Sequence, residues 1–183
     1  MKKGLLVTTL LAASTLLLAS CEKTVSFDEA KKHVADNYTS TEEKLFDVKA
    51  VTKVTKADGF FATFFEVGED TEETSDKIGV LAAQSLDLFG DKATYKVDGK
   101  KLSVESNVDV KAYLEELGAK VNEGDEASGS IFSKVSFDDD GYLASEVQKI
   151  DNLHFKSTST LGLTVEGTLS MESTVTYTAR PAN

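Results

Sequence analysis

The segment from Leu161 to Thr178 alternates strictly between two kinds of side chain over eighteen residues, and it constrains the fold more than any other feature of the chain. A period of two is typical of a β-strand with one face in the core and one face in water. At about 3.3 Å per residue, a single strand of this length would extend for about 60 Å. We therefore expect the strand to bend, or to turn back as a hairpin, at Gly167. The mostly apolar face carries Leu161, Leu163, Val165, Gly167, Leu169, Met171, Ser173, Val175 and Tyr177.

Two amphipathic helices are available to cover that apolar face. The motif Ser26-Phe-Asp-Glu29 has the pattern of a capping box and predicts a helix over residues 27–38. Asp109 is a suitable N-cap for a second helix, which we expect to end at Gly118. The apolar faces of the two helices are Phe27, Ala30, Val34 and Tyr38 in the first, and Val110, Tyr113, Leu114 and Leu117 in the second.

Three further segments have the signature of antiparallel hairpins. Residues 46–54 alternate as a strand, residues 56–59 form a turn, and Phe60–Phe65 forms the second arm, with aromatic side chains on both faces. This arm is either covered on two sides or faces a ligand cavity on one side. Residues 94–105 form a hairpin with Asp98-Gly99 as a type I′ turn. Residues 131–150 form another hairpin, in which Asp138-Asp-Asp-Gly141 makes the turn.

The remaining segments are expected to be irregular or are ambiguous. Residues 68–77 and 119–130 are rich in acidic residues or glycine, and we expect both to be loops. Residues 78–89 fit a strand or a helix by their apolar spacing, and the pattern slightly favours a strand.

The N-terminus has the features of an export signal. Lys2 and Lys3 precede an apolar run, Leu5–Leu18, which is shorter than the about 20 residues that a membrane-spanning helix needs. The sequence Leu18-Ala19-Ser20-Cys21 that follows resembles the lipobox of bacterial lipoproteins. In that family the cysteine thiol receives a diacylglyceryl group and the signal peptide is cut before it, so the resemblance implies a lipid anchor at Cys21, the only cysteine.

The resemblance implies that residues 1–20 are the signal peptide and that residues 21–25 are the acylated cysteine and a short tether. The length of the rest, and its order of helices and strands, predict a single α+β domain over residues 26–183. The protein would be attached by its lipid to the extracytoplasmic side of a bacterial membrane. More than one acyl chain on one residue makes such anchoring stable.

Charge and residue inventory exclude several classes of function. Residues 22–183 have 18 basic and 31 acidic side chains, a formal net charge of −13, which repels nucleic acid. No catalytic motif surrounds His33 or His154, so we predict no catalytic residue, no cofactor and no enzyme. The Gly141 turn does not fit a calcium loop because Ser136 and Val147 would occupy ligand positions, and we predict no metal site.

The order of elements, the turn Phe137-Asp-Asp-Asp-Gly-Tyr142 and the lipobox together resemble the LolA-like and LppX/LprG-like carriers of lipids and lipoproteins. The resemblance implies a strongly curved antiparallel sheet, a half-barrel, packed on two helices around an apolar cavity for an acyl chain or another hydrophobic ligand. The alternative is an interaction or structural lipoprotein with a packed core, no cavity and an unidentified protein partner. The side chains that would line the cavity are Phe60, Phe64, Leu161, Leu163, Val165, Leu169, Met171 and Val175.

Overall fold

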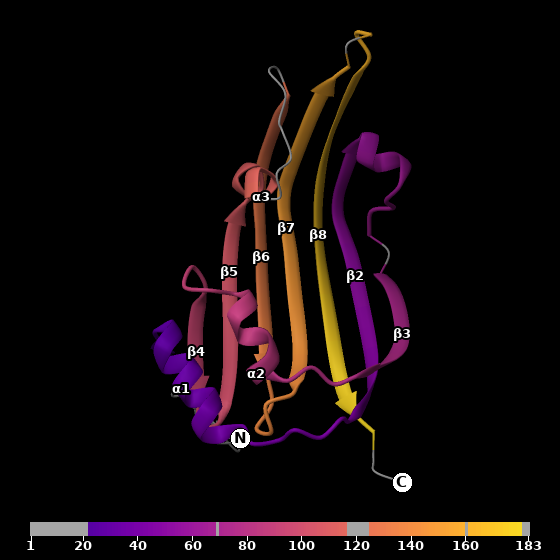
Figure 1. Ribbon diagram of the computed structural model, residues 1–183. Coiled ribbons are helices and arrows are strands. Elements are labelled where there is room, and N and C mark those ends of the chain that lie inside the picture. The colour runs from indigo at the N-terminus through magenta and orange to yellow at the C-terminus, as the bar shows by residue number, and fades with distance from the viewer. Residues whose placement is uncertain (1–21, 69, 117–124, 160, 181–183) are drawn as a thin grey trace, which may run out of the picture.

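The computed structural model describes residues 22–68, 70–116, 125–159 and 161–180, which form an α+β domain built on one open antiparallel sheet (Figure 1). The strands are β1 (Lys23–Val25), β2 (Leu45–Gly59), β3 (Asp70–Ile78), β4 (Thr94–Asp98), β5 (Lys101–Asp109), β6 (Glu126–Phe137), β7 (Leu143–Thr158) and β8 (Thr164–Ala179). The helices are α1 (Phe27–Asn37), α2 (Ala82–Ser85) and α3 (Val110–Glu116), with 3₁₀ turns η1 (Phe60–Thr63) and η2 (Leu86–Leu88). The eight strands are ordered β1-β4-β5-β6-β7-β8-β2-β3.

The alternating C-terminal segment forms one long strand, β8, which pairs with β7 and β2 along its length. Of the two alternatives expected at Gly167, a bend or a hairpin turn, the hairpin turn is wrong, because Gly167 lies inside β8 and pairs with Gly59 and Phe155. The chain turns instead before β8, at Gly162, whose φ is +79°. Pairing shifts occur in both neighbouring strands, between Val54 and Lys56 and between Ile150 and Leu153. Such bulges add twist and bend, so the irregularity lies beside β8 rather than within it.

Helix α1 begins as expected and covers one end of the sheet. The Ser26 hydroxyl accepts a hydrogen bond from the Glu29 amide at 3.2 Å, and the Glu29 carboxylate accepts one from the Ser26 amide at 2.8 Å. Both halves of the predicted capping box are therefore present. Ala30 and Val34 of α1 pack in a core that also contains Leu86 and strand residues such as Leu102 and Leu143. Figure 1 shows α1 and α2 over the lower half of the sheet, with α3 beside the upper parts of β5 and β6.

Two segments were predicted wrongly because charge and aromatic content did not indicate their pairing. Strand β2 continues to Gly59, and the following residues form η1 instead of a second hairpin arm. Most of the expected acidic loop, residues 68–77, is the edge strand β3, which is exposed on both faces. Its carboxylates face lysines of β2, with Lys49–Glu72 at 2.8 Å and Lys53–Asp70 at 3.8 Å. Charged side chains are one of the ways in which proteins protect an edge strand from further pairing.

The ambiguous segment 78–89 is mainly helical, and the preference for a strand is wrong. After Ile78 it forms α2 and η2, which bury Ala82, Ser85 and Leu86 against α1 and the sheet. The apolar spacing allowed both conformations, and the packing of α2 and η2 against α1 and the sheet favours the helix.

Several turns and termini also differ in detail from expectation. Residues 126–130, expected to be loop, belong to β6, while residues 119–124 lie outside the described part. Lys23–Val25, expected to be tether, forms β1 and pairs with β4. Asp109 caps α3 as predicted, since its carboxylate accepts bonds from the amides of residues 111 and 112 at 3.0 and 3.1 Å. The predicted helix end at Leu117 and Gly118 lies outside the described residues.

The β4–β5 hairpin is confirmed, but its turn type is not. Asp98 pairs with Lys101, so the two loop residues are Gly99 and Lys100. Gly99 has φ +58°, whereas in the described part of the chain Asn152 is the only residue other than glycine with positive φ. A positive φ at the first loop residue alone is the geometry of a type II′ turn, not type I′.

Candidate functional site

A continuous row of uncharged polar side chains crosses the face of the sheet that carries most of its apolar residues. Strand pairing places one polar residue of each of six adjacent strands opposite the next one. These residues, called the polar row below, are Ser106, Ser133, Gln148, Ser173, Thr52 and Thr71. The Thr52 hydroxyl donates a hydrogen bond to the Ser173 hydroxyl at 3.0 Å, which confirms that these two side chains lie on the same face. The polar row divides this face into two apolar halves.

The lower half is the core covered by α1 and α2. Next to the polar row it contains the aligned residues Val104, Val135, Glu146, Val175 and Ala50. Farther down, Tyr95, Leu102 and Phe137 are almost fully buried beneath the helices. This half is a packed core, so it leaves the upper half as the candidate for binding.

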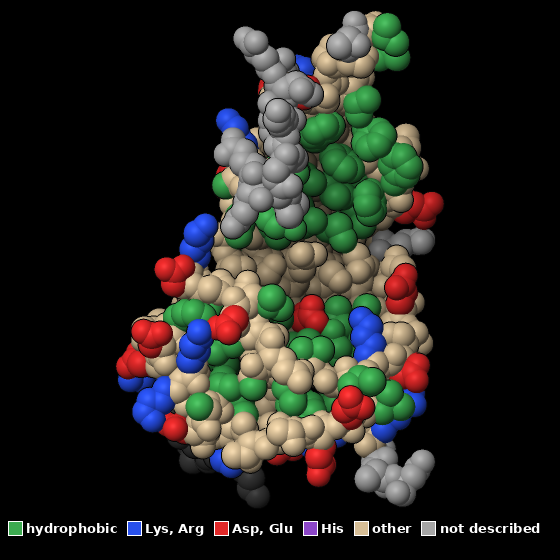
Figure 2. Space-filling view, in the orientation of Figure 1, with side chains coloured by type: hydrophobic (Ala, Val, Ile, Leu, Met, Phe, Trp, Pro, Cys, Tyr) green, Lys and Arg blue, Asp and Glu red, His purple; other side chains and the backbone are tan. Residues whose placement is uncertain are grey.

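The upper half begins with an apolar row that spans five strands and continues toward the β7–β8 turn. We call it the upper apolar surface; its members on the sheet are Val108, Ile131, Ile150, Met171, Val54, Leu153, Leu169, Ala57, Ala127, Phe155 and Val165. Figure 2 shows hydrophobic side chains gathered over the upper part of the molecule, with a band without hydrophobic side chains below them. Of the described helices, α3 contacts β5 and β6 at its side, and η1 contacts β8 and β2 at its end. Most of this surface is half-buried: Val54 and Leu169 are buried, and Val165 is exposed.

Aromatic side chains of η1 and its C-terminal end add to the upper apolar surface. Gly167 lacks a Cβ that would lie 2.9 Å from the Phe61 ring, so this ring rests against the strand on the apolar face. Phe60 contacts both Phe61 and Phe64, with ring centroids 5.8 and 4.9 Å apart. Phe64 is 66% exposed. The turn of η1 therefore folds aromatic rings back over the sheet and leaves some of them in contact with solvent.

The predicted lining residues are brought together only in part. Val165, Leu169 and Met171 belong to the upper apolar surface, and Phe60 and Phe64 extend it. Val175 lies on the other side of the polar row, beside the covered core. Leu161 and Leu163 lie in the β7–β8 turn at the far end and are largely exposed.

Sequence reasoning missed the polar row itself. In the alternating patterns of three separate strands, Thr52, Ser133 and Ser173 share the parity of the apolar residues, and each is a single hydroxyl residue in its series. Only the pairing of the strands shows that they are neighbours. The one signal in the sequence was that each apolar series contains a single hydroxyl residue, which could have indicated that these residues lie side by side across the strands.

One ionisable pair lies next to the polar row on the apolar face. The Tyr177 hydroxyl donates a short hydrogen bond to a carboxylate oxygen of Glu146. Burial, and then this bond to the carboxylate, raise the pKa of Tyr177 well above its usual value. Glu73 of the edge strand β3 pairs with Ala50, which aligns with Glu146 through Val175 of β8. The row of aligned residues that contains Glu146 therefore carries a second carboxylate. The charged groups at this level are acidic, which disfavours an anionic ligand.

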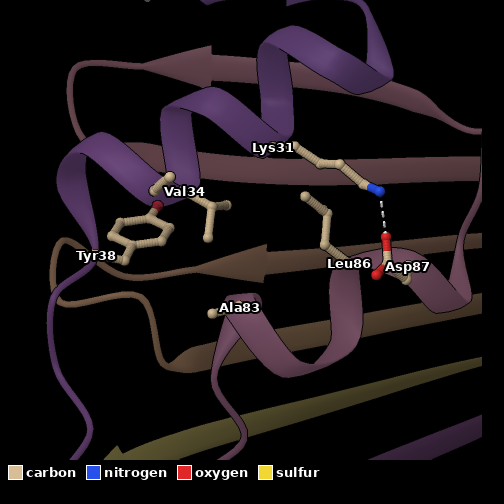
Figure 3. Close-up of a pocket in the computed structure, with 7 residues that line it drawn as sticks. Lys31, Val34, Tyr38, Ala83, Leu86 and Asp87 are labelled. Carbon is tan, nitrogen blue, oxygen red and sulfur yellow. Dashed lines mark ion pairs between the residues drawn. The ribbon is translucent and has the colours of Figure 1, made fainter.

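A cleft lies between α1 and α2 (Figure 3). It is a cleft of about 280 Å³ lined by Lys31, Val34, Ala35, Tyr38, Ala83, Leu86 and Asp87. The Lys31 ammonium and the Asp87 carboxylate pair across it at 2.6 Å. The apolar residues at its base, Val34 and Leu86, are buried members of the core. This cleft is smaller than the usual range of about 300 to 1,000 Å³ for ligand pockets, and it is the seam where the two helices meet.

The opposite face of the sheet is polar and carries ion pairs between strands. Glu105 pairs with Lys96 and Lys134, each at 2.8 Å, and these bonds hold the pKa of the Glu105 carboxyl below its usual value. His154 lies on this face, 3.8 Å from Glu126 and 3.9 Å from Glu166. The other histidine, His33, lies in α1, and its Nε2 is 2.9 Å from the carbonyl oxygen of Lys100.

Among the residues that the structure describes, no three His, Cys, Asp or Glu side chains gather closely enough to hold a metal ion. None of the helices in the described ranges is long and apolar enough to cross a membrane. The chain matches no protein-family model, no curated protein and no solved structure.

Proposed function

We propose that this protein is a bacterial lipoprotein, anchored through Cys21 on the extracytoplasmic side of a membrane, which binds a lipid or other hydrophobic ligand without making or breaking a bond. The observation that carries the proposal is the upper apolar surface, where one sheet face continues beyond the part that α1 and α2 cover. Large contiguous apolar patches are uncommon on the surface of monomeric proteins and mark binding sites.

The magnitude of the hydrophobic term is adequate for a ligand of this kind. A ligand that covers about 300 Å² of apolar surface gains roughly 7 kcal/mol at about 25 cal/mol per Å². Part of this gain offsets the lost freedom of the ligand, so micromolar to millimolar binding is the expected range. The partly exposed aromatic rings of Phe60 and Phe64 supply area that can close over a bound chain.

The LolA-like and LppX/LprG-like resemblance supports the same proposal. Those carriers combine an antiparallel sheet with helices on its apolar face, and this chain has an open antiparallel sheet with helices over part of one face. In our proposal the sheet bends around the ligand as a half-barrel. The bulges in β2 and β7 lie beside the upper apolar surface, where such a bend would be needed.

The position of the anchor sets the orientation of the binding surface. Glu22, the residue after Cys21, lies beside Ser103, whose hydroxyl donates to its carboxylate at 3.4 Å. Ser103 lies at the level of Thr176 in β8, through the pairings of β5 to β8. Val165 is eleven residues from Thr176 along β8, or about 36 Å. The ligand surface would therefore lie at the other end of the sheet from the acylated residue.

The experiment uses the chain from residue 22 onward, which contains every described strand and helix. It is produced in a bacterium, purified without detergent and measured by native mass spectrometry before and after incubation with mixed lipids. We expect adducts of lipid mass that are lost on organic extraction. Phe64→Glu should abolish them, because it places a carboxylate on the upper apolar surface.

Leu88→Glu is the matched control. Leu88 is 84% exposed but lies in η2, away from the upper apolar surface, so this variant should keep its lipid. Retention of lipid by a folded Phe64→Glu protein contradicts the proposed site. If the protein shows no lipid adduct after incubation with mixed lipids, the lipid ligand is contradicted. That result favours a second candidate ligand, an apolar segment of a partner protein, which the same surface could bind.

The anchor is tested separately in the intact precursor. Growth with an alkyne-labelled palmitate should label the wild-type chain, and Cys21→Ala should remove the label and release the protein from the membrane fraction. Labelling that persists in Cys21→Ala contradicts the anchor.

A further inference from the structure

We infer that the ligand of the upper apolar surface is an amphiphile whose head group is uncharged or cationic and donates hydrogen bonds, with the head bound at the polar row and the tail lying along the upper apolar surface. This inference rests on the proposed function and specifies its ligand class. It is carried by the alignment of the polar row, by the sign of the charges beside it and by the length of the surface beyond it.

The polar row supplies the hydrogen-bonding groups for a head group. Gln148 at its centre is exposed, and Ser133 and Ser173 on either side of it are half-buried. A hydroxyl or amide next to apolar side chains is costly to desolvate unless it keeps a partner. A purely apolar tail that reached the polar row would remove water from these hydroxyl and amide groups and give them no new partner. A ligand with a polar end at the same level would replace that water with its own hydrogen bonds.

The charges near the row select the kind of head group. The level next to it carries the carboxylates of Glu146 and Glu73, and the aligned residues of β2, β5, β6 and β8 at the two levels that flank the row are apolar. The Tyr177 hydroxyl already donates to Glu146, which leaves further lone pairs on that carboxylate free to accept. With a net charge of −13 beyond Cys21, the domain disfavours a carboxylate or phosphate head group and favours a donor.

The distance from the polar row to the end of the surface accommodates a tail. Ser173 and Val165 are eight residues apart along β8, which corresponds to about 26 Å. One leaflet of a bilayer has a hydrocarbon thickness of about 15 Å, half of the whole core. A single membrane-type acyl chain therefore fits between the polar row and the β7–β8 turn without passing the end of the sheet.

The test compares three probes that share one tail: monolauroylglycerol, dodecylammonium and laurate. Binding to the chain from residue 22 is measured by equilibrium dialysis at pH 8, below the aggregation concentration of each probe. We expect the glyceride and the ammonium to bind at least tenfold more tightly than laurate. Equal affinities, or tighter binding of laurate, overturn the inference about the head group.

Variants at the polar row locate the head group. Gln148→Leu should lower the preference for the glyceride over laurate about threefold to tenfold, since one net hydrogen bond is worth about 0.5–1.5 kcal/mol. Glu146→Gln keeps an acceptor for Tyr177 but removes the charge, and it should raise the affinity for laurate. The measured quantity is the ratio of the affinity for the glyceride to the affinity for laurate. The two probes have the same tail, so a change in tail binding cancels in this ratio.

A matched control and the behaviour of Phe64→Glu separate the two proposals. Thr176→Val lies on the opposite, polar face and should leave the ratio unchanged. If Phe64→Glu abolishes binding while Gln148→Leu and Glu146→Gln leave the ratio unchanged, the head-group inference fails and the proposed function stands. If none of the three probes binds the wild-type protein, both fail.

Discussion

Substitution of Gly79 by alanine tests how tightly the β3–α2 connection packs against the sheet. A Cβ at Gly79 would lie 2.4 Å from Cε2 of Phe46 and 2.9 Å from Cδ1 of Tyr142. Both rings are buried, at 2% and 1% exposure, and the Tyr142 hydroxyl donates to the Glu42 carbonyl oxygen at 2.7 Å. Because that hydroxyl is held, the Tyr142 ring cannot turn away without losing its bond. Overpacking of this kind costs about 1–3 kcal/mol.

The assay is urea unfolding followed by circular dichroism, with thermal unfolding as a second measurement. For a domain of this size, a loss of 1–3 kcal/mol lowers Tm by about 2–12 °C. The sign of the change in the free energy of unfolding is informative, because the φ of Gly79 is not in the left-handed region and alanine can adopt it. An alanine that met no neighbour there would instead stabilise the protein by about 0.4–1 kcal/mol, through the lower entropy of the unfolded chain.

A double-mutant cycle identifies the responsible contact. Phe46→Leu shortens the side chain that the new Cβ would overlap most closely, so Gly79→Ala should cost less in that background than in the wild-type protein, and the overlap with the Tyr142 ring accounts for the cost that remains. An equal cost in both backgrounds, or stabilisation by Gly79→Ala alone, would refute the steric argument.

Two further predictions concern local interactions. Ser26→Ala removes the acceptor of the Glu29 amide and should lower the free energy of unfolding, measured in urea, by about 1 kcal/mol. Ser26→Asp supplies another acceptor and should keep most of this stability. An unchanged free energy of unfolding in Ser26→Ala would contradict the role of the cap. Glu105→Gln should lower stability by up to about 1 kcal/mol at pH 7. Lys134 and Lys96 hold the Glu105 pKa below its usual value, so this stabilisation is present above the unfolded pKa of about 4.3 and is lost as the pH falls through the folded pKa. A difference between wild type and Glu105→Gln that persists at lower pH would contradict the ion-pair account.

Local features of the fold could be predicted from the sequence because each depends on a few neighbouring residues. The capping box at Ser26, the cap at Asp109, the turn before Gly141 and the alternation of β8 are all interactions or periodicities within one segment. For the same reason the α+β character and the two-sided nature of the long strands could be predicted before any pairing was known.

The errors occurred where distant partners decide the conformation. β3 is a strand because it pairs with β2 along its whole length, and residues 82–88 are helical because they pack against α1. The Phe60–Phe64 segment forms η1 because β2 stays paired with β8 up to Gly59, which leaves the aromatic residues to turn back over the sheet. Each of these outcomes needs a partner far away in the sequence.

The candidate site divides in the same way. The sequence by itself determined which side chains share the apolar parity of each strand, because successive residues of a strand point to opposite faces, and this placed Val165, Leu169 and Met171 together. Only the tertiary structure decided that Ser133, Ser173 and their neighbours meet in one polar row and that α1 and α2 cover one side of it. Register between strands depends on pairing and bulges across the whole sheet, and periodicity within one strand carries no information about it.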